Sequence, residues 1–379
     1  MATVAVPKKP SRKALAKVRT AAGLTTRVLR LRLKDKHAKD LRALASEVNF
    51  VWNYVNDLSY KVLRREHRFL SAYDLSAYTS GATKEGLSLH SQTVQAVNDE
   101  FVTRRKQCKK AKLRWRVSNP KRSNYSLGWI PFKKSAITYR NGQLHLAGKP
   151  LSLWDSYGLG QYELGAGSVS EDARGRWYIN LTVQVKKATP TEGKGAIGID
   201  LGLKNIVVTS EGEPVEAPRF YRKEELSLAS AQRAGKKRRV AALHAKIRNR
   251  RKDFLHKLSR QLVNACGAIF VGNVSASTLA QTPMAKSVLD AGWSMFRTMV
   301  SYKSDDAGGW YLEIDEAYST QTCSACFARS GPRGLEGLEI RGWVCSNCGA
   351  VHHRDTNSAQ IILARGHARL AGGIPFLSA

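Results

Sequence analysis

Acidic residues are scarce in this chain, and the scarcity limits its partners. Only 30 Asp and Glu residues stand against 62 Lys and Arg in 379 residues, which gives a formal net charge of +32 at pH 7. A compact protein with this excess repels itself unless a polyanion neutralises it. We therefore expect nucleic acid as the partner; the alternative is a soluble protein that is merely basic.

Long apolar runs and a secretion signal are also missing. No apolar run reaches the roughly 18 residues that would span a bilayer, which argues against a membrane protein. Residues 1–10 lack the apolar core of a signal peptide, so we expect a cytoplasmic protein. The apolar fraction of 42% is enough to build real cores, and the length suits two to four modules.

Cysteine is sparse, and most of it is paired. Four of the six cysteines form two Cys-x-x-Cys pairs with 18 residues between them. In a chain without a secretion signal such pairs indicate a metal site and not disulfides. Four thiolates form a closed tetrahedral zinc site with no open position for substrate, so this metal should organise the fold. Four free cysteines are the alternative. The expected ligands are Cys323, Cys326, Cys345 and Cys348.

Two aspartates stand where secondary-structure elements are expected to end or begin. Asp200 ends the apolar strand 196–200, and Asp355 follows the cysteine pairs where a helix should start. Two-metal nucleases hold Mg²⁺ with carboxylates from separate elements that converge on one face. The pair therefore predicts a Mg²⁺-dependent nuclease. The alternatives are that Asp200 only shapes a turn before Gly202 and that Asp355 is an ordinary helix N-cap.

Periodicity predicts the order of the elements. Period-two alternation predicts strands at 27–33 and 177–183, and Asn141-Gly142 predicts a hairpin. Residues 37–66 and 91–116 have the spacing of helices. After a linker at 189–193, an α/β domain is expected from strands at 196–200, 205–210, 268–272 and 310–315, a basic helix at 226–264 and a helix after Asp355.

Basic residues gather on two of the expected helices. The tail of helix 91–116 carries them on several faces with no acid among them, and the stretch from Arg233 to Lys252, both included, contains ten Lys or Arg. We expect these helices to contact phosphates; a solvated basic face is the alternative. The candidate nucleic-acid-binding residues are Arg104, Arg105, Lys109, Lys110, Arg248, Arg250 and Arg251.

These motifs together resemble TnpB, the transposon-encoded RNA-guided DNA endonuclease that is ancestral to the type V CRISPR effectors. Residues 198–202 are similar to the first motif of its RuvC-type, RNase H-like domain. Residues 318–326 are similar to its Thr/Ser-Gln-Thr-Cys-Ser-x-Cys segment. Residues 354–359 are similar to its Arg-Asp-x-Asn-Ala-Ala motif, which carries the last catalytic Asp. Residues 130–133 and 177–183 resemble its wedge barrel.

The resemblance implies a multidomain α+β fold. An RNase H-like (RuvC) α/β domain with a zinc ribbon insertion is accompanied by a wedge β-barrel and a helical recognition domain. The implied boundaries are a basic flexible arm at 1–27, the wedge barrel at 28–36 and 120–190, the recognition domain at 37–119, the RuvC-like domain at 191–319 and 351–379, and the ribbon at 320–350.

The resemblance also implies an activity and partners. The implied protein binds a guide RNA, reads a short target-adjacent motif, and cuts double-stranded target DNA with Mg²⁺ in one RuvC site, while a basic channel holds the heteroduplex. It would act near the nucleoid of a bacterium or archaeon, with a possible functional link to a transposase. The alternatives are a nuclease-dead RNA-guided repressor, a minimal type V CRISPR effector and, more distantly, a conventional transposase.

One position departs from the family pattern. The family usually has Glu at the end of the strand that corresponds to 268–272, and this chain has Gly272. The neighbouring strand 310–315 should end at the same cleft. Glu316 is therefore the expected third catalytic carboxylate beside Asp200 and Asp355, with Asp315 and Glu313 as alternatives.

Overall fold

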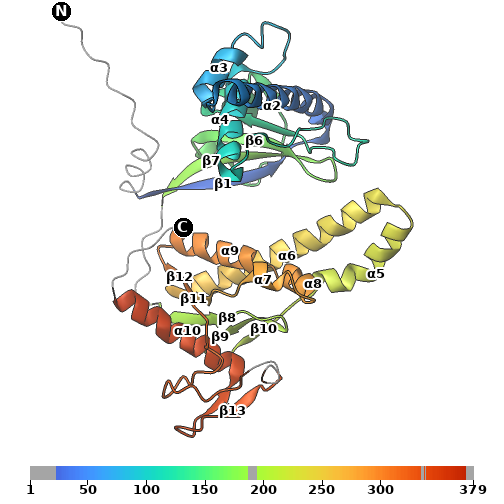
Figure 1. Ribbon diagram of the computed structural model, residues 1–379. Helices are drawn as coiled ribbons and strands as arrows, with labels where there is room; N and C mark the ends of the chain where they lie inside the picture. Colours follow the sequence, from blue (N-terminus) through green and yellow to red (C-terminus); the bar gives the residue numbers. More distant parts are fainter. Residues whose placement is uncertain (1–22, 187–193, 334–336, 338, 373–379) are drawn as a thin grey trace, which may run out of the picture. The chain divides into compact units, whose positions relative to one another are not determined.

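The chain divides into two compact units, Met1–Lys186 and Lys187–Ala379. The computed structural model describes residues 23–186, 194–333, 337 and 339–372, and Figure 1 shows their course. Most of the expected N-terminal arm and the linker at 189–193 lie outside the described residues. No helix in the described ranges is long and apolar enough to cross a membrane.

The first unit contains a four-stranded antiparallel sheet. Its order is β1 (Leu24–Arg32), β7 (Trp177–Lys186), β6 (Leu164–Glu171) and β2 (Trp129–Phe132). Trp177, Ile179, Leu181 and Val183 are buried on one face of β7, which confirms the period-two pattern. Because β1 begins at Leu24, the last residues of the expected arm belong to this sheet.

A second, three-stranded sheet follows in the same unit. It consists of β3 (Ile137–Arg140), β4 (Gln143–Leu146) and β5 (Lys149–Leu151). Asn141 and Gly142 both have positive φ, 50° and 73°, as a two-residue type I′ turn requires. The hairpin is thereby confirmed.

Within the described residues, the α-helices of the first unit are α2 (Ala38–Glu66), α3 (Ala72–Thr79) and α4 (Ser91–Cys108). Their buried faces join the sheets in one apolar core. The helix expected to run to residue 116 stops at Cys108, because Lys109 turns into the left-handed conformation. The basic residues after it therefore lie on an extended segment and not on a helix.

The second unit is built on a five-stranded mixed sheet. Its order is β10 (Pro214–Glu216), β9 (Asn205–Thr209), β8 (Ala196–Asp200), β11 (Ala268–Gly272) and β12 (Trp310–Ile314). β8, β11 and β12 are mutually parallel, whereas β9 and β10 are antiparallel to their neighbours. The sheet contains the strands of the α/β domain expected from the sequence, and the α+β fold class is confirmed.

Helices cover both faces of this sheet (Figure 1). One face packs against α6 (Lys237–Ala265) and α9 (Trp293–Asp306) through Ile199, Val271 and their neighbours. The other face packs against α10 (Arg354–Ala371) through Phe270 and Ile362. α10 approaches β8 so closely that a Cβ at Gly198 would lie 2.1 Å from the Ala359 carbonyl oxygen. The glycine therefore brings the start of α10 next to the end of β8.

The single basic helix expected at 226–264 is two helices. α5 (Phe220–Arg233) ends before Gly235, which has φ +63°, and α6 returns alongside it. Two short helices, α7 (Ala276–Leu279) and α8 (Ala285–Ala291), follow β11. Between β12 and α10 lies the cysteine-rich segment, with the antiparallel pair β13 (Gly342–Val344) and β14 (Val351–His353).

Candidate functional site

Asp200 lies at the C-terminal end of β8, at the sheet edge where β11 and β12 also end. Its Oδ1 accepts a hydrogen bond of 2.9 Å from the hydroxyl of Ser358 on α10, so this residue does more than shape a turn. Burial raises the pKa of Asp200 to about 7, and the nearby carboxylates of Asp355 and Glu316 add to the rise. The carboxylates of Asp355 and Glu316 therefore lie close enough to Asp200 to disfavour its ionisation.

Asp355 lies in the first turn of α10 and is not its N-cap, which is His353. Both carboxylate oxygens accept hydrogen bonds of 2.9 Å from the guanidinium of Arg341. Arg341 directly precedes β13, so the cysteine-rich segment contributes a cation to this edge. Nothing in the sequence singled out Arg341, because the contact joins two segments only through the fold.

Glu316 lies two residues after the end of β12. A Cβ built on Gly272 would lie 2.7 Å from the Glu316 Oε2 atom. The carboxylate of Glu316 thus occupies the space where a side chain at position 272 would begin. Burial raises the pKa of Glu316, and Arg297 lowers it.

The two alternative acids are engaged elsewhere. Glu313 accepts a hydrogen bond of 3.0 Å from the Tyr311 hydroxyl and pairs with Arg297 at 3.2 Å. Asp315 accepts a hydrogen bond of 3.1 Å from the backbone of Ala317. Neither is among the groups that act on Asp200, and Glu316 is the better candidate of the three.

A buried pair of serines supports this edge. The hydroxyls of Ser319 and Ser358 are 2.7 Å apart. Because the Ser358 hydroxyl donates its hydrogen bond to Asp200, the Ser319 hydroxyl must donate the hydrogen bond to Ser358. Ser358 stands where the family motif has Ala, so this support is a feature of the present chain.

The four cysteine sulfurs lie within 4.8 Å of one another. The Cys323–Cys348 and Cys326–Cys345 pairs have Sγ–Sγ distances of 3.7 and 3.6 Å. A tetrahedral site with Zn–S bonds of about 2.3 Å has sulfur–sulfur edges of about 3.8 Å. The spacing suits a metal ion such as zinc.

The residues around the cysteines join them to the carboxylate edge. His352 Nε2 lies 3.0 Å from Cys323 Sγ, and the His352 ring packs on Trp343, as a packing residue would. Asn357 of α10 accepts a hydrogen bond of 2.8 Å from the Ser324 amide and donates one of 2.7 Å to the Thr322 carbonyl. The start of α10 is therefore fixed to the first cysteine pair.

The candidate phosphate-binding residues fall into two groups. Arg105 is buried, and its guanidinium donates to Ser59 and to the Leu70 carbonyl. Arg251 is mostly buried and pairs with Asp290 at 2.8 Å. These two guanidiniums bind groups of the protein itself. The expectation that Arg105 and Arg251 contact phosphates is therefore wrong. The exposed members are Arg104, Lys109, Lys110, Arg248 and Arg250, of which Arg104 and Arg250 also pair with Glu100 and Glu224.

Two family models match the chain. Residues 178–282 match the model described as "Probable transposase", and residues 293–362 match the model described as "Cas12f1-like, TNB domain". The second match spans α9, β12, the cysteine pairs and Asp355. Together the two matches include all three candidate carboxylates.

The chain is also similar in sequence to several curated proteins. A putative RNA-guided DNA endonuclease of Streptomyces pristinaespiralis is 36% identical over 259 residues, 64% of this chain and 63% of that protein. The putative RNA-guided DNA endonuclease InsQ of Escherichia coli K12 is 28% identical over 52% of this chain and 56% of its own length. TnpB-like protein L79 of Acanthamoeba polyphaga mimivirus is 25% identical over 58% of this chain and 45% of its own length. The matched region spans less than two thirds of each relative. The motifs, the family models and the relatives agree, and the resemblance of this chain to the TnpB proteins is confirmed.

Proposed function

We propose that this chain is an RNA-guided DNA endonuclease of an insertion-sequence transposon. It binds a guide RNA, and it cuts double-stranded DNA beside a short target-adjacent motif by Mg²⁺-dependent phosphodiester hydrolysis. The observation that carries the proposal is the carboxylate of Glu316, which fills the place of a side chain at Gly272 and acts on Asp200 together with Asp355. The names of the curated relatives support the same activity.

The carboxylate edge fits divalent cations. Oxygen ligands are what Mg²⁺ prefers, and carboxylates that disfavour one another's ionisation are relieved by a cation between them. Asp200, Glu316 and Asp355 would hold Mg²⁺, which supplies positive charge to the scissile phosphate and a reactive water. Ser358 keeps the Asp200 carboxylate in one orientation. Arg341 neutralises Asp355, so a cation that binds there has to compete with or displace this contact.

The alternative of a nuclease-dead repressor rests on Gly272, which offers no ligand. Loss of the usual Glu without replacement would leave two carboxylates, and these would hold two metal ions loosely. The position of Glu316 favours the active enzyme instead, because an acid returns to the space that Gly272 leaves open.

We also propose that the four cysteines bind one structural zinc, and that the two units comprise a wedge barrel, recognition helices, a RuvC-like domain and a zinc ribbon. The sulfur spacing supports the first point. A cytoplasmic protein near the nucleoid, with a link to a transposase, is the setting that this function implies. The net charge of +32 suits a protein that covers guide RNA and DNA.

The direct test is cleavage and binding of one matched DNA target by the guide-loaded protein with Mg²⁺. Asp200→Ala and Asp355→Ala should abolish cutting and leave guided binding largely intact, because binding depends on base pairing and phosphate contacts. Wild-type protein that binds the target but never cuts it would favour the repressor.

A further inference from the structure

A basic segment outside the carboxylate site has an organisation that the proposed nuclease chemistry does not explain. Residues 109–126 link α4 to β2 without forming a helix or a strand, and we call them the basic strap. The strap contains no acidic residue. Its basic residues are Lys109, Lys110, Lys112, Arg114, Arg116, Lys121 and Arg122.

Asparagine side chains of α2 fix the first half of the strap. Asn56 donates to the Leu113 carbonyl at 2.8 Å and accepts from the Leu113 amide at 2.9 Å. Asn53 does the same for Arg116, at 2.9 and 2.8 Å. Each amide pairs with both backbone groups of one residue, as a neighbouring strand would. The strap is thereby held extended along α2.

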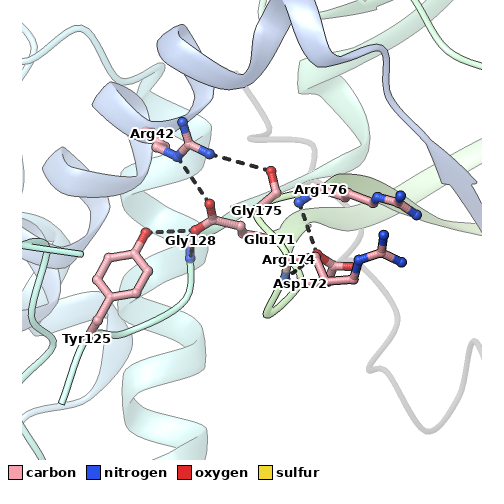
Figure 2. Close-up of polar contacts among 8 residues, drawn as sticks. All are labelled: Arg42, Tyr125, Gly128, Glu171, Asp172, Arg174, Gly175 and Arg176. Atoms are coloured by element: carbon pink, nitrogen blue, oxygen red, sulfur yellow. Dashed lines mark hydrogen bonds and ion pairs between the residues drawn. The ribbon is translucent and has the colours of Figure 1, made fainter. Parts of the chain in front are cut away.

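A buried carboxylate fixes the far end of the strap. Figure 2 shows Glu171 accepting hydrogen bonds from Arg42, from the Tyr125 hydroxyl at 2.7 Å and from the Gly128 amide at 3.1 Å. Burial and the Glu171 contact raise the pKa of Tyr125 to about 12, so the phenol stays protonated and remains a donor. The end of the strap is therefore bonded to Glu171 of β6, and Arg42 of α2 holds the same carboxylate.

A closed loop lies between these two anchors. The Ser126 amide donates to the Val117 carbonyl at 2.9 Å, and the Val117 amide donates to the Ser126 hydroxyl at 3.0 Å. These bonds close the base of a loop that carries exposed Lys121 and Arg122. The loop presents positive charge from a fixed base.

Some side chains of the strap point into the protein and others point into solvent. Leu113 is buried, and Arg116 turns inward to donate to the Leu127 carbonyl at 2.9 Å. Arg114 and Trp115 are exposed, and Trp115 as a whole residue is 51% exposed. A large apolar ring is thus held outward beside basic residues.

We propose that Trp115 stacks on an unpaired base of a nucleic-acid strand whose phosphates contact Arg114, Lys121 and Arg122. An aromatic face beside basic side chains is the combination that binds single strands, because every base offers a ring face and every linkage a charge. The strap supplies both on a fixed backbone, so little ordering is needed on binding. The inference rests on the proposed function for its class of partner. The strand comes from the guide RNA or from unpaired DNA.

The test measures binding of the full-length chain to fluorescein-labelled oligonucleotides of one sequence by fluorescence anisotropy. The probes are single-stranded DNA, the matching RNA, and DNA that is abasic at every position. Trp115→Ala should weaken binding to the DNA or the RNA by about tenfold, the scale of one base–aromatic stack. Trp115→Phe should retain most of the affinity. The probe that loses more affinity identifies the source of the strand.

The abasic probe separates stacking from charge. Wild type and Trp115→Ala should bind abasic DNA equally, because no base is left to stack. Trp154→Ala serves as the matched control, since Trp154 is exposed to a similar degree in the same unit but lies outside the strap; it should bind every probe as the wild type does. Equal loss on intact and abasic probes, or no loss on any probe, would overturn the proposal.

The phosphate contacts have their own readout. Replacing Lys121 and Arg122 by Gln should flatten the slope of log affinity against log salt by roughly 0.7 for each lost contact to a single strand. An unchanged slope would remove the loop from the proposal. None of these measurements depends on cleavage, so a chain that never cuts DNA but loses base-dependent binding in Trp115→Ala would refute the proposed nuclease and leave the strap inference standing.

Discussion

At position 272 the end of β11 has no side chain, and the carboxylate of Glu316 lies where one would begin. β11 and β12 are adjacent parallel strands, so their C-terminal ends reach the same edge. An acid lost from one strand can therefore be replaced from the next without moving the backbone. In this account Glu316 supplies the carboxylate that the family usually carries one strand away.

Asp200 makes the metal-free protein sensitive to pH. Its pKa is about 7 in the folded chain against an ordinary value of 3.8, so the folded state binds more protons between these values. The free energy of unfolding should therefore fall as pH rises from about 4 to 7. In a metal chelator, Asp200→Asn should raise the melting temperature at pH 8 and do so much less at pH 5. A stabilisation that does not change with pH would contradict the shift.

At the scale of elements, the cysteine-rich segment and α10 form one structural unit through Asn357. We predict one zinc per chain, and Cys345→Ala should reduce the zinc content of the purified protein to near zero. Cys108→Ala is the control, because Cys108 is exposed and lies far along the chain from the four ligands. Metal analysis that finds no zinc in the wild type, or full zinc in Cys345→Ala, would refute the site.

Two arginines of α6 should differ in their roles: one in nucleic-acid binding and the other in the stability of the fold. Arg248 is exposed, and Arg248→Gln should flatten the slope of log affinity for RNA against log salt by roughly 0.7–0.9. Arg251→Gln should instead lower the melting temperature, because it leaves the buried Asp290 without its ion pair. If the two variants change the salt slope equally, the assignment of Arg251 to the interior is wrong.

The elements that the sequence predicted well are those with a local pattern. The alternation in 177–183 and the Asn141-Gly142 turn describe contacts within a strand or a hairpin, and both were confirmed. The end of α4 was missed because the groups that hold residues 113–116 in place are asparagines of α2, far away in the sequence. The split of the long basic helix had a local signal, Gly235, that the run of basic residues obscured.

The candidate site follows the same rule. Asp200 and Asp355 could be proposed because their motifs are short. Glu316 could be proposed because the resemblance implies that its strand ends at the same edge, and the observed strand order agrees with this. Arg341 and Ser319 carry no such signal. Each contacts the site only through the packing of the cysteine-rich segment against α10.

At the scale of the whole molecule, a net charge of +32 and a small cluster of acidic residues are expected to serve different steps, binding and cutting. In the proposed function, the basic surfaces would hold nucleic acid and the acidic edge would cut it. Substitution of one of these acidic residues should therefore slow cutting without weakening binding. This is the most direct test of the proposed function.

That test is the cleavage rate and the affinity of the guide-loaded protein on one matched target with Mg²⁺. Glu316→Gln should slow cutting by about a hundredfold or more, the scale of losing one group that stabilises charge in a transition state, with guided binding unchanged. Gly272→Glu combined with Glu316→Ala should recover part of the rate, because it returns the acid to β11. Gly272→Glu alone should not increase the cleavage rate, since the new Cβ would clash with the Glu316 carboxylate. Wild-type cutting by Glu316→Gln would contradict the account.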